Sequence, residues 1–265
     1  MNYEKTLATN PFSDDYWKAE LKAYNLHSTP FCTEHLDVKW RTIQGRCDDY
    51  LNVNMRFDDT PLPMLLLHGQ LWMSLTPMEI QSAALALHRA KGHVIAGGLG
   101  LGYFALRAAA KPEVTKITVF EHEPLVVKWF QHAFKDRPEL AKIEIVEDDM
   151  RLVFKNYEAD FAYVDIYQDM LGAEVLKDAQ LFRRKNKIKR YQYWGYEKTV
   201  LELLTRKMLK QPTFMIGNDL YSYFHHWMHT PYGGAGTGML SDYSHLTLDR
   251  SFLVHARRGF TEFPL

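Results

Sequence analysis

Short apolar strands alternate with helices between residues 92 and 167, and this alternation constrains the fold more than any other feature of the sequence. The strands read HVIAGG, KITVFEHE, KIEIVEDD and DFAYVDIY, and the helices between the first three read LGYFALRAAA and EPLVVKWFQHAF. Such alternation is typical of βαβ units, in which parallel strands are covered by helices on both faces. We therefore predict an α/β fold with a doubly wound, mostly parallel sheet over residues 76–265.

A different pattern precedes this region. Apolar and polar residues alternate over 36–42 and again over 51–57, and a third apolar segment follows two prolines. Alternation with a period of two indicates strands with one buried face. We expect a small antiparallel β unit over about residues 34–75. With the residues before it, including a short helix over 14–24, it forms an N-terminal segment over 1–75.

The run Thr76-Pro77-Met78-Glu79 marks the junction between the two parts. It matches a capping box, in which Thr76 is the N-cap and the Glu79 side chain reaches back to it. The pattern predicts a helix that begins here and ends before Gly92.

Composition excludes several classes of protein. Lys and Arg total 32 of the 265 residues and Asp and Glu also total 32, so no net charge draws the chain to nucleic acid or to an anionic membrane. Two cysteines, Cys32 and Cys47, make neither a disulfide framework nor a four-ligand zinc site. No apolar run approaches the roughly 20 residues of a membrane helix, and the polar start is unlike a signal peptide. We expect a cytoplasmic protein without membrane contact.

The junction between the first strand and its helix is rich in glycine, with Gly97, Gly98, Gly100 and Gly102 in the segment AGGLGLG. Glycine lets a backbone turn tightly and lets a ligand approach closely. Glu121 ends the next strand, 24 residues after Gly97, near the offset of an acid that binds ribose hydroxyls. On their own, glycine turns of this kind are also common in structural roles.

Further acids follow the next two strands, namely Asp148 and Asp149, then Asp165 and Asp169. The carboxyl ends of parallel strands meet at one edge of the sheet, where ligands of such folds bind. A single acid at a strand end can equally be a helix N-cap. The whole series favours a binding edge.

In this order and spacing, the segments AGGLGLG, VFEHEP, IVEDDM and FAYVDIY resemble the motif series of class I S-adenosylmethionine (SAM)-dependent methyltransferases. Within that superfamily the chain is most similar to the spermidine synthase-like (aminopropyltransferase) branch, over about residues 35–170. The resemblance implies a Rossmann-like sheet and SAM as the group donor.

The resemblance also implies roles for single residues. The four loop glycines would line the amino-acid side of the nucleoside, Glu121 would bind the ribose hydroxyls, and His122 would lie beside the adenine. Asp149, with the backbone of Met150, would bind the adenine amino group. Asp165 matches the acid that faces the transfer site, and it is our candidate for a proton-accepting catalytic residue.

The chain departs from the aminopropyltransferase pattern where that pattern holds its acids. Gly100 stands in place of the loop aspartate, Asp169 follows Asp165 at four residues instead of three, and Gln81-Ser82-Ala83 replaces the usual Y-H-E. A polyamine needs several carboxylates to replace its hydration. We therefore predict methyl transfer to an unidentified small-molecule acceptor. Aminopropyl transfer from decarboxylated SAM is the alternative, and a non-catalytic SAM-binding protein is a third.

A nicotinamide-dependent dehydrogenase is a weaker hypothesis. Gly100, Gly102 and Ala105 also satisfy G-x-G-x-x-A with Glu121 downstream. The N-terminal β unit and the acids after the third and fourth strands count against it.

Basic residues are concentrated over 183–190, and Tyr191, Tyr193, Trp194 and Tyr196 follow. Phosphate contacts combined with base stacking would use such a pattern. A solvated helix end whose aromatic residues pack into the core is the favoured interpretation. A nucleic-acid partner is therefore possible but not favoured.

The C-terminal part carries weaker signals. His225 and His229 lie one helical turn apart, but without a metal-binding motif we predict no metal site. The glycine-rich loop over 233–238 is a candidate lid. The segment SFLVHARR would add an antiparallel strand, and a homodimer is possible for such folds.

Overall fold

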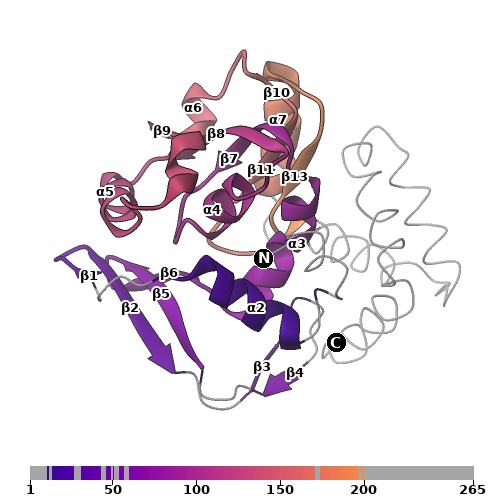
Figure 1. Cartoon of the computed structure of the whole chain (residues 1–265). Coiled ribbons are helices and arrows are strands. Elements are labelled where there is room, and N and C mark those ends of the chain that lie inside the picture. Colours follow the sequence, from indigo (N-terminus) through magenta and orange to yellow (C-terminus); the bar gives the residue numbers. More distant parts are fainter. Residues whose placement is uncertain are drawn as a thin grey trace, which may run out of the picture.

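The computed structural model describes residues 11, 14–26, 31–42, 46–48, 50, 54–56, 60–170, 174–196 and 199. Figure 1 shows a larger α/β part, with a smaller antiparallel sheet beneath it. The predicted elements after residue 199, including the candidate lid over 233–238, His225 and His229, lie outside the described residues.

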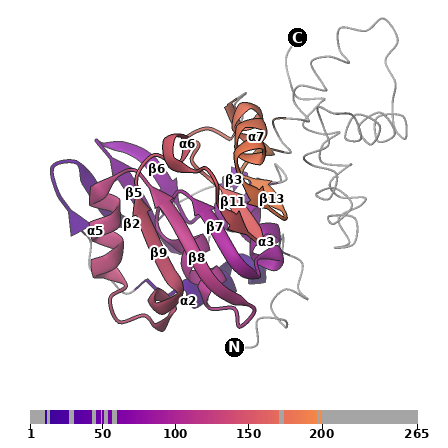
Figure 2. The ribbon, with the colours of Figure 1, turned by 90° about the horizontal axis from the view of Figure 1, so that it is seen from above.

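The larger part contains a five-stranded sheet in which every neighbouring pair of strands is parallel. In Figure 2 these strands lie side by side in the order β13-β11-β7-β8-β9. They are β7 (Gly92–Gly97), β8 (Val114–Glu121), β9 (Ile143–Glu147), β11 (Phe161–Val164) and β13 (Tyr191–Tyr193). This confirms the predicted doubly wound, Rossmann-like sheet.

The strand order reverses beside β7. The chain continues from β7 to β8 and β9 on one side, and then crosses to β11 and β13 on the other side. In open sheets of this kind the helices that leave β7 and β11 diverge, and a crevice opens outside the carboxyl ends of the two strands. The topology therefore places a ligand crevice between the loops after β7 and β11.

Helices cover both faces of this sheet. The short helix α4 (Tyr103–Ala109) and the longer α5 (Pro124–Ala133) pack on β8, and α5 also reaches β9. A second hydrophobic cluster contains Phe154, which follows α6 (Met150–Val153), together with Val175 and Phe182 of α7 (Glu174–Lys185). Our sequence analysis did not predict α7, although the spacing of Val175, Ala179 and Phe182 is that of a buried helical face.

The smaller part is a four-stranded antiparallel sheet in the order β1-β2-β5-β6. An antiparallel unit is thus present as predicted, but the third predicted segment forms two strands, and the strand expected over 51–57 contributes only residues 54–56 to a separate pair. Its strands are β1 (Phe31–Cys32), β2 (Leu36–Thr42), β5 (Pro61–Leu67) and β6 (Gln70–Ser74). A separate hairpin joins β3 (Arg46–Asp48) to β4 (Asn54–Arg56), and the predicted N-terminal helix is α2 (Asp14–Tyr24). Shorter pieces complete the described chain: the 3-10 turn η1 (Pro138–Lys142) and a parallel pair of β10 (Glu158–Ala159) with β12 (Lys187–Ile188).

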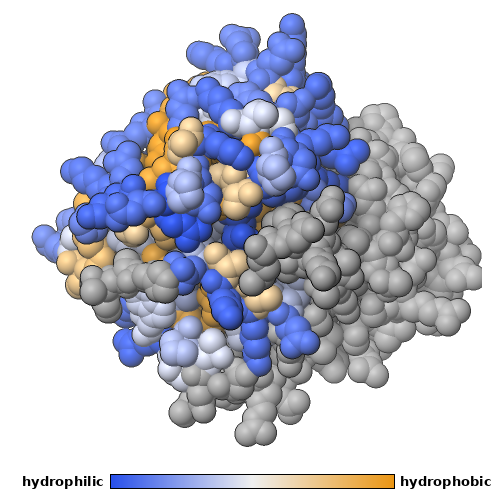
Figure 3. All heavy atoms as spheres, in the orientation of Figure 1, coloured by the Kyte–Doolittle hydropathy of each residue, from blue (hydrophilic) through white to orange (hydrophobic). Residues whose placement is uncertain are grey.

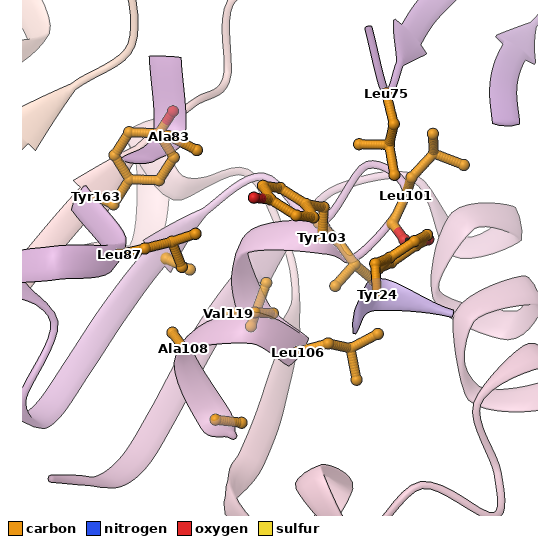
Figure 4. Packing of buried hydrophobic residues seen from close by; sticks show 14 of the residues in the cluster. Tyr24, Leu75, Ala83, Leu87, Leu101, Tyr103, Leu106, Ala108, Val119 and Tyr163 are labelled. Carbon is orange, nitrogen blue, oxygen red and sulfur yellow. The ribbon is translucent and has the colours of Figure 1, made fainter. Parts of the chain in front are cut away.

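One hydrophobic core joins the two parts. It contains Leu36 and Leu65 of the antiparallel sheet together with Leu106 of α4 and Val119 of β8. Figure 4 shows the Tyr24 ring beside Leu101 and Leu106, at the end of the glycine-rich loop. The boundary that we predict between residues 75 and 76 is therefore bridged by shared packing.

The predicted capping box is wrong. Helix α3 (Pro77–Arg89) begins where expected, with Thr76 at the N-cap, but the Thr76 side chain makes no capping hydrogen bond. Its hydroxyl oxygen is buried and has no partner among the described residues. Glu79 does not reach back to the N-cap, because its side chain lines a cavity.

A buried ion pair ties α2 to α4. The Glu20 carboxylate is 2% exposed and accepts hydrogen bonds from Arg107 Nε at 2.8 Å and Arg107 Nη2 at 3.0 Å. The Tyr103 hydroxyl donates a further bond to Glu20 at 3.0 Å. Both charged groups are removed from water, so the ion pair is stable only if the two groups satisfy each other's charge and hydrogen bonds.

Hydrophilic side chains cover most of the described surface in Figure 3, and hydrophobic residues form small groups between them. Leu71, Trp72 and Leu152 are the large hydrophobic side chains that stand exposed in the described part of the chain. None of the helices described there has both the length and the apolar character needed to cross a membrane.

Replacing Glu20 with Ala should lower the free energy of unfolding by about 3–5 kcal/mol, because it removes the carboxylate that accepts two hydrogen bonds from the buried Arg107 guanidinium. Urea unfolding would measure the change. Glu144→Ala is the matched control, since Glu144 pairs with Lys116 at 2.6 Å on the exposed surface and should cost below about 1 kcal/mol. Equal losses in the two variants would contradict the assigned role of the buried pair.

Candidate functional site

A cavity of about 270 Å³ lies at the carboxyl ends of β7, β8, β9 and β11, at the reversal of strand order. Seven of the nine residues to which the resemblance assigned roles line it, namely Gly98, Gly100, Glu121, His122, Asp149, Met150 and Asp165, and Asp148 lines it as well. These residues come from four strand ends, and the parallel sheet brings them together. The cavity is therefore the candidate binding site.

Gly98 forms the contact between the two loops that border the cavity. Its φ angle is +85°, and a Cβ atom at this position would lie 2.1 Å from the carbonyl oxygen of Asp165. No side chain fits there without moving the backbone at Asp165. The close approach of the two backbones requires glycine at this position.

Gly97 and Gly102 are not part of the cavity wall. A Cβ atom on Gly97 would meet Met150 Sδ at 2.5 Å, and one on Gly102 would meet the Phe130 ring at 2.3 Å. Gly102 is also the N-cap of α4, with φ +76°. The structure thus gives these two glycines packing roles, in place of the direct lining that the resemblance implied.

The Glu121 carboxylate is fixed at the end of β8. Its Oε2 atom accepts from the backbone N–H of Leu99 at 2.9 Å, and its Oε1 atom accepts from the backbone N–H of Glu123 at 2.9 Å. Glu121 is buried, whereas His122 beside it is exposed, with Nδ1 3.5 Å from Glu121 Oε1. Each carboxylate oxygen has two lone pairs, so Glu121 can accept two further bonds from ligand hydroxyls.

Asp149 has a structural task as well as a place in the cavity. It is the N-cap of α6, where its Oδ1 atom accepts from the backbone N–H of Arg151 at 2.8 Å. Arg151 in turn binds Asp178 of α7, with Nη2 and Oδ2 3.0 Å apart, and its guanidinium lies over the ring of Tyr167. The N-cap interpretation of a strand-end acid therefore holds for Asp149.

Asp165 follows β11 and is held by the sheet, since its backbone N–H donates to the carbonyl of Gly97 at 2.8 Å. Burial raises the pKa of Asp165 from 3.8 to about 7, although the neighbouring Tyr163 hydroxyl lowers it. Asp169, which the sequence placed nearby, is exposed and does not line the cavity. The side of the cavity next to β11 therefore has one acid from the predicted series.

Glu79 is a second acid on this side, and our sequence analysis did not identify it as a site residue. Burial raises the pKa of Glu79 well above its ordinary value, and the nearby charge of Asp165 raises it further. The only sequence signal for Glu79 was its position in the first turn of a helix. Because a capping box accounts for an acid at that position, there was no reason to assign Glu79 to the site.

The antiparallel sheet supplies a third wall. Trp72 and Met73 of β6 line the cavity, and the Met73 sulfur accepts a hydrogen bond from the backbone N–H of Leu101 at 3.1 Å. Trp194 lines it from the end of β13, where its Nε1 atom donates to the Ser82 hydroxyl at 3.0 Å. These contacts join distant parts of the sequence, so no local motif announces them.

The aromatic residues after the basic segment are buried. Tyr191 and Tyr193 belong to β13 with their rings stacked 5.7 Å apart, and Trp194 and Tyr196 are also buried. Rings that pack into the core do not form an exposed platform for bases. The structure thus supports the packing interpretation of residues 191–196.

No three His, Cys, Asp or Glu side chains come together to hold a metal ion in the described part of the chain.

No protein-family model and no curated protein matches this chain. Among solved structures it is similar to a precorrin-8W decarboxylase from Methanobacterium thermoautotrophicum, with 19% identity over 42% of this chain and 59% of that one, at a TM-score of 0.34. It is also similar to a spermidine synthase from Thermotoga maritima (15% identity, 60% and 53% coverage, TM-score 0.37). A third is protein arginine methyltransferase 10 from Arabidopsis thaliana (12% identity, 66% and 48% coverage, TM-score 0.32).

In each case the alignment spans less than two thirds of the other structure. The fold described above rests on the strand order of this chain itself.

Gly98→Ala should destabilise the protein more than Gly69→Ala. Both glycines have a positive φ, +85° and +77°, but a Cβ atom on Gly69 would meet nothing within 4 Å. The control should therefore lose only the roughly 1–2 kcal/mol of the strained backbone. Gly98→Ala should lose a further ~1–3 kcal/mol, because the loop after β11 must move. Similar unfolding free energies for the two variants would refute the close contact.

The raised pKa of Asp165 predicts how stability depends on pH. A carboxyl with a raised pKa in the folded state favours folding below its unfolded pKa near 4, and this contribution is lost as the pH rises through about 7. Asp165→Asn should therefore match the wild type near pH 4 and exceed its stability by on the order of 2–4 kcal/mol at pH 8. Denaturant unfolding across this range is the measurement, and Asp169→Asn, at an exposed site, is the control that should follow the wild type.

Proposed function

We propose that this protein is a SAM-dependent transferase and that it moves a methyl group to a small-molecule acceptor. The observation that carries the proposal is the pairing of a glycine-rich loop with the buried, backbone-bound Glu121 at the point where the strand order reverses. Asp165 lines the same cavity from the loop on the other side of that point. A nucleoside donor needs the first two features, and a transfer reaction needs the third.

The residues present fit the donor. Glu121 has lone pairs free to accept from both ribose hydroxyls after its two backbone bonds are made. Gly98 and Gly100 expose backbone along the loop, and His122 and Asp149 line the same end of the cavity. When bound, SAM would supply a methyl group on a positively charged sulfur. The protein would then hold the acceptor in line with that group, which is the main requirement of the reaction.

Position 100 favours methyl over aminopropyl transfer. A Cβ atom on Gly100 would lie 2.5 Å from Met73 Sδ, so an aspartate there would have to displace the methionine. Met73 also accepts the hydrogen bond from Leu101, which fixes it against the loop. In this chain the Met73 thioether therefore fills the space next to the loop. The aminopropyltransferases that the chain resembles carry an acid at the corresponding loop position.

Asp165 suits the task of accepting a proton. A pKa of about 7 leaves an appreciable fraction of the carboxyl ionised at neutral pH and still gives it affinity for a proton. The neighbouring Tyr163 hydroxyl favours the charged form of this carboxylate. An acceptor hydroxyl or amine would lose its proton to this group as its bond to the methyl carbon forms.

Aminopropyl transfer from decarboxylated SAM is the second candidate, and one observation favours it. Glu79 and Asp165 place two carboxylates at the transfer side of the cavity, and an amine acceptor would be attracted to them. A non-catalytic SAM-binding protein would share the donor site alone. A cytoplasmic location and a homodimer stay predictions.

Calorimetric titration with SAM, decarboxylated SAM and NAD in parallel tests the donor assignment. We expect the wild type to prefer SAM, and Glu121→Ala to weaken SAM binding by about 1–3 kcal/mol through the loss of two charged hydrogen bonds. Glu147→Ala is the matched control, because Glu147 ends the neighbouring strand β9 but is exposed and lies outside the cavity wall. Unchanged SAM affinity in Glu121→Ala would contradict the ribose site, and a preference for NAD would overturn the proposal.

A further inference from the structure

Glu79 and Asp165 reach the same cavity from two rigid elements. Glu79 lies in the first turn of α3, and Asp165 follows β11 directly. The turn that carries Glu79 is fixed, because its carbonyl accepts from the Ser82 hydroxyl at 2.8 Å and that hydroxyl accepts from Trp194. Asp165 is fixed by its backbone bond to Gly97. Glu79 and Asp165 thus line one cavity from two elements whose backbones are fixed.

The Glu79 carboxylate has no role in stabilising the structure around it. It does not cap α3, and it makes no hydrogen bond within the part of the chain that the structure describes. A half-buried acid without a partner is costly as a carboxylate. Its position therefore has no structural explanation in α3 itself, and its place in the cavity wall indicates a task there.

Two carboxylates in one poorly hydrated space repel each other, and holding one proton between them relieves this repulsion. The direction of both pKa values agrees, since each is raised and the charge of Asp165 contributes to the rise at Glu79. The pair therefore keeps a proton to a higher pH than two isolated carboxyl groups would.

We propose that Glu79 and Asp165 form a proton-sharing pair at the transfer site, in which Glu79 is a second proton-accepting residue that the motif series does not contain. This inference rests on the proposed function, because it assigns the pair to the transfer side of the SAM site.

The pair would be prepared for catalysis by the charge of the donor. It gives up its proton when a positive charge arrives beside it, because the ionised form of both acids is then stabilised. The acceptor's lone pair next forms a bond to the methyl carbon, while the carbon–sulfur bond breaks and leaves its electrons on sulfur. The acceptor's proton moves to a carboxylate oxygen of the pair and returns to solvent when the products leave.

Other titratable groups also line the cavity, and several of them are bound to other groups, which distinguishes them from Glu79 and Asp165. Glu121 accepts two backbone bonds, Asp149 caps α6, and Arg151 is bound to Asp178. The Tyr163 hydroxyl lies near Asp165 and lowers the pKa of that carboxyl. The remaining groups are Tyr103 from α4, His122 after β8, Asp148 after β9 and Tyr167 after β11.

The first test counts protons released on donor binding, by calorimetry at pH 7 in buffers of different ionisation enthalpy. SAM and S-adenosylhomocysteine differ by the charge on sulfur, so the wild type should release more protons with SAM than with S-adenosylhomocysteine. Glu79→Gln and Asp165→Asn should each lose most of that difference. Glu147→Gln, at the exposed end of β9, should keep it. SAM binding without excess proton release in the wild type would overturn the pair.

The second test needs no ligand. Titration of carboxyl-labelled protein by carbon-13 NMR should show the Glu79 midpoint falling by about one pH unit or more in Asp165→Asn, because the like charge that Asp165 carries when Glu79 titrates is gone. Tyr163→Phe should move the Asp165 midpoint upward, which shows that this variant still folds around Asp165. A Glu79 midpoint unchanged by Asp165→Asn would refute the pair. Failure of the wild type to bind SAM would instead refute the proposed function, while this titration still decides whether the pair exists.

Discussion

The register between β7 and β11 determines where the two sides of the cavity meet. Val164 pairs with Gly97, so the next residue on each strand, Asp165 and Gly98, emerge side by side at the edge of the sheet. The Asp165 N–H then continues the ladder by donating to the Gly97 carbonyl. A shift of one residue would turn each side chain to the opposite face of the sheet. The position of the transfer-side acid is therefore a consequence of strand pairing and does not depend on a flexible loop.

The N-terminal part of the chain completes the site from below the glycine-rich loop. The Tyr24 hydroxyl donates to the Leu101 carbonyl, and Met73 Sδ accepts from the Leu101 N–H, so both backbone groups of one loop residue are bound by this part. Glu20 meanwhile holds Arg107 and Tyr103 of the helix that follows the loop. A loop with several glycines has high conformational entropy when free. These contacts hold the loop in one conformation, which its glycine-rich sequence would not do on its own.

Local patterns predicted the sheet, α2 and the antiparallel unit because each has a hydrophobic period that its own residues display. The same reasoning failed where a residue's environment is built by distant segments. Glu79 matched a capping box, but the cavity took its side chain, and a single sequence carries no sign of Asp165 lying next to it. The strand β13 and the helix α7 were not predicted, because each buries a face of only a few residues and basic residues lie close to that face in the sequence.

The number of hydrogen-bond donors that reach each acid differs along the cavity, and this difference explains why the acids differ in chemistry. At the ends of β8 and β9, Glu121 receives two backbone N–H bonds and Asp149 receives one, so these carboxylates are matched by fixed dipoles before any ligand arrives. Beside β11 no backbone N–H donates to the side chains of Asp165 or Glu79 within the described residues, although the Tyr163 hydroxyl lies near Asp165. Charge on these two acids therefore depends mainly on what binds beside them. A positively charged donor and a proton from the acceptor are the two species that would stabilise it, and both belong to the transfer reaction that we propose.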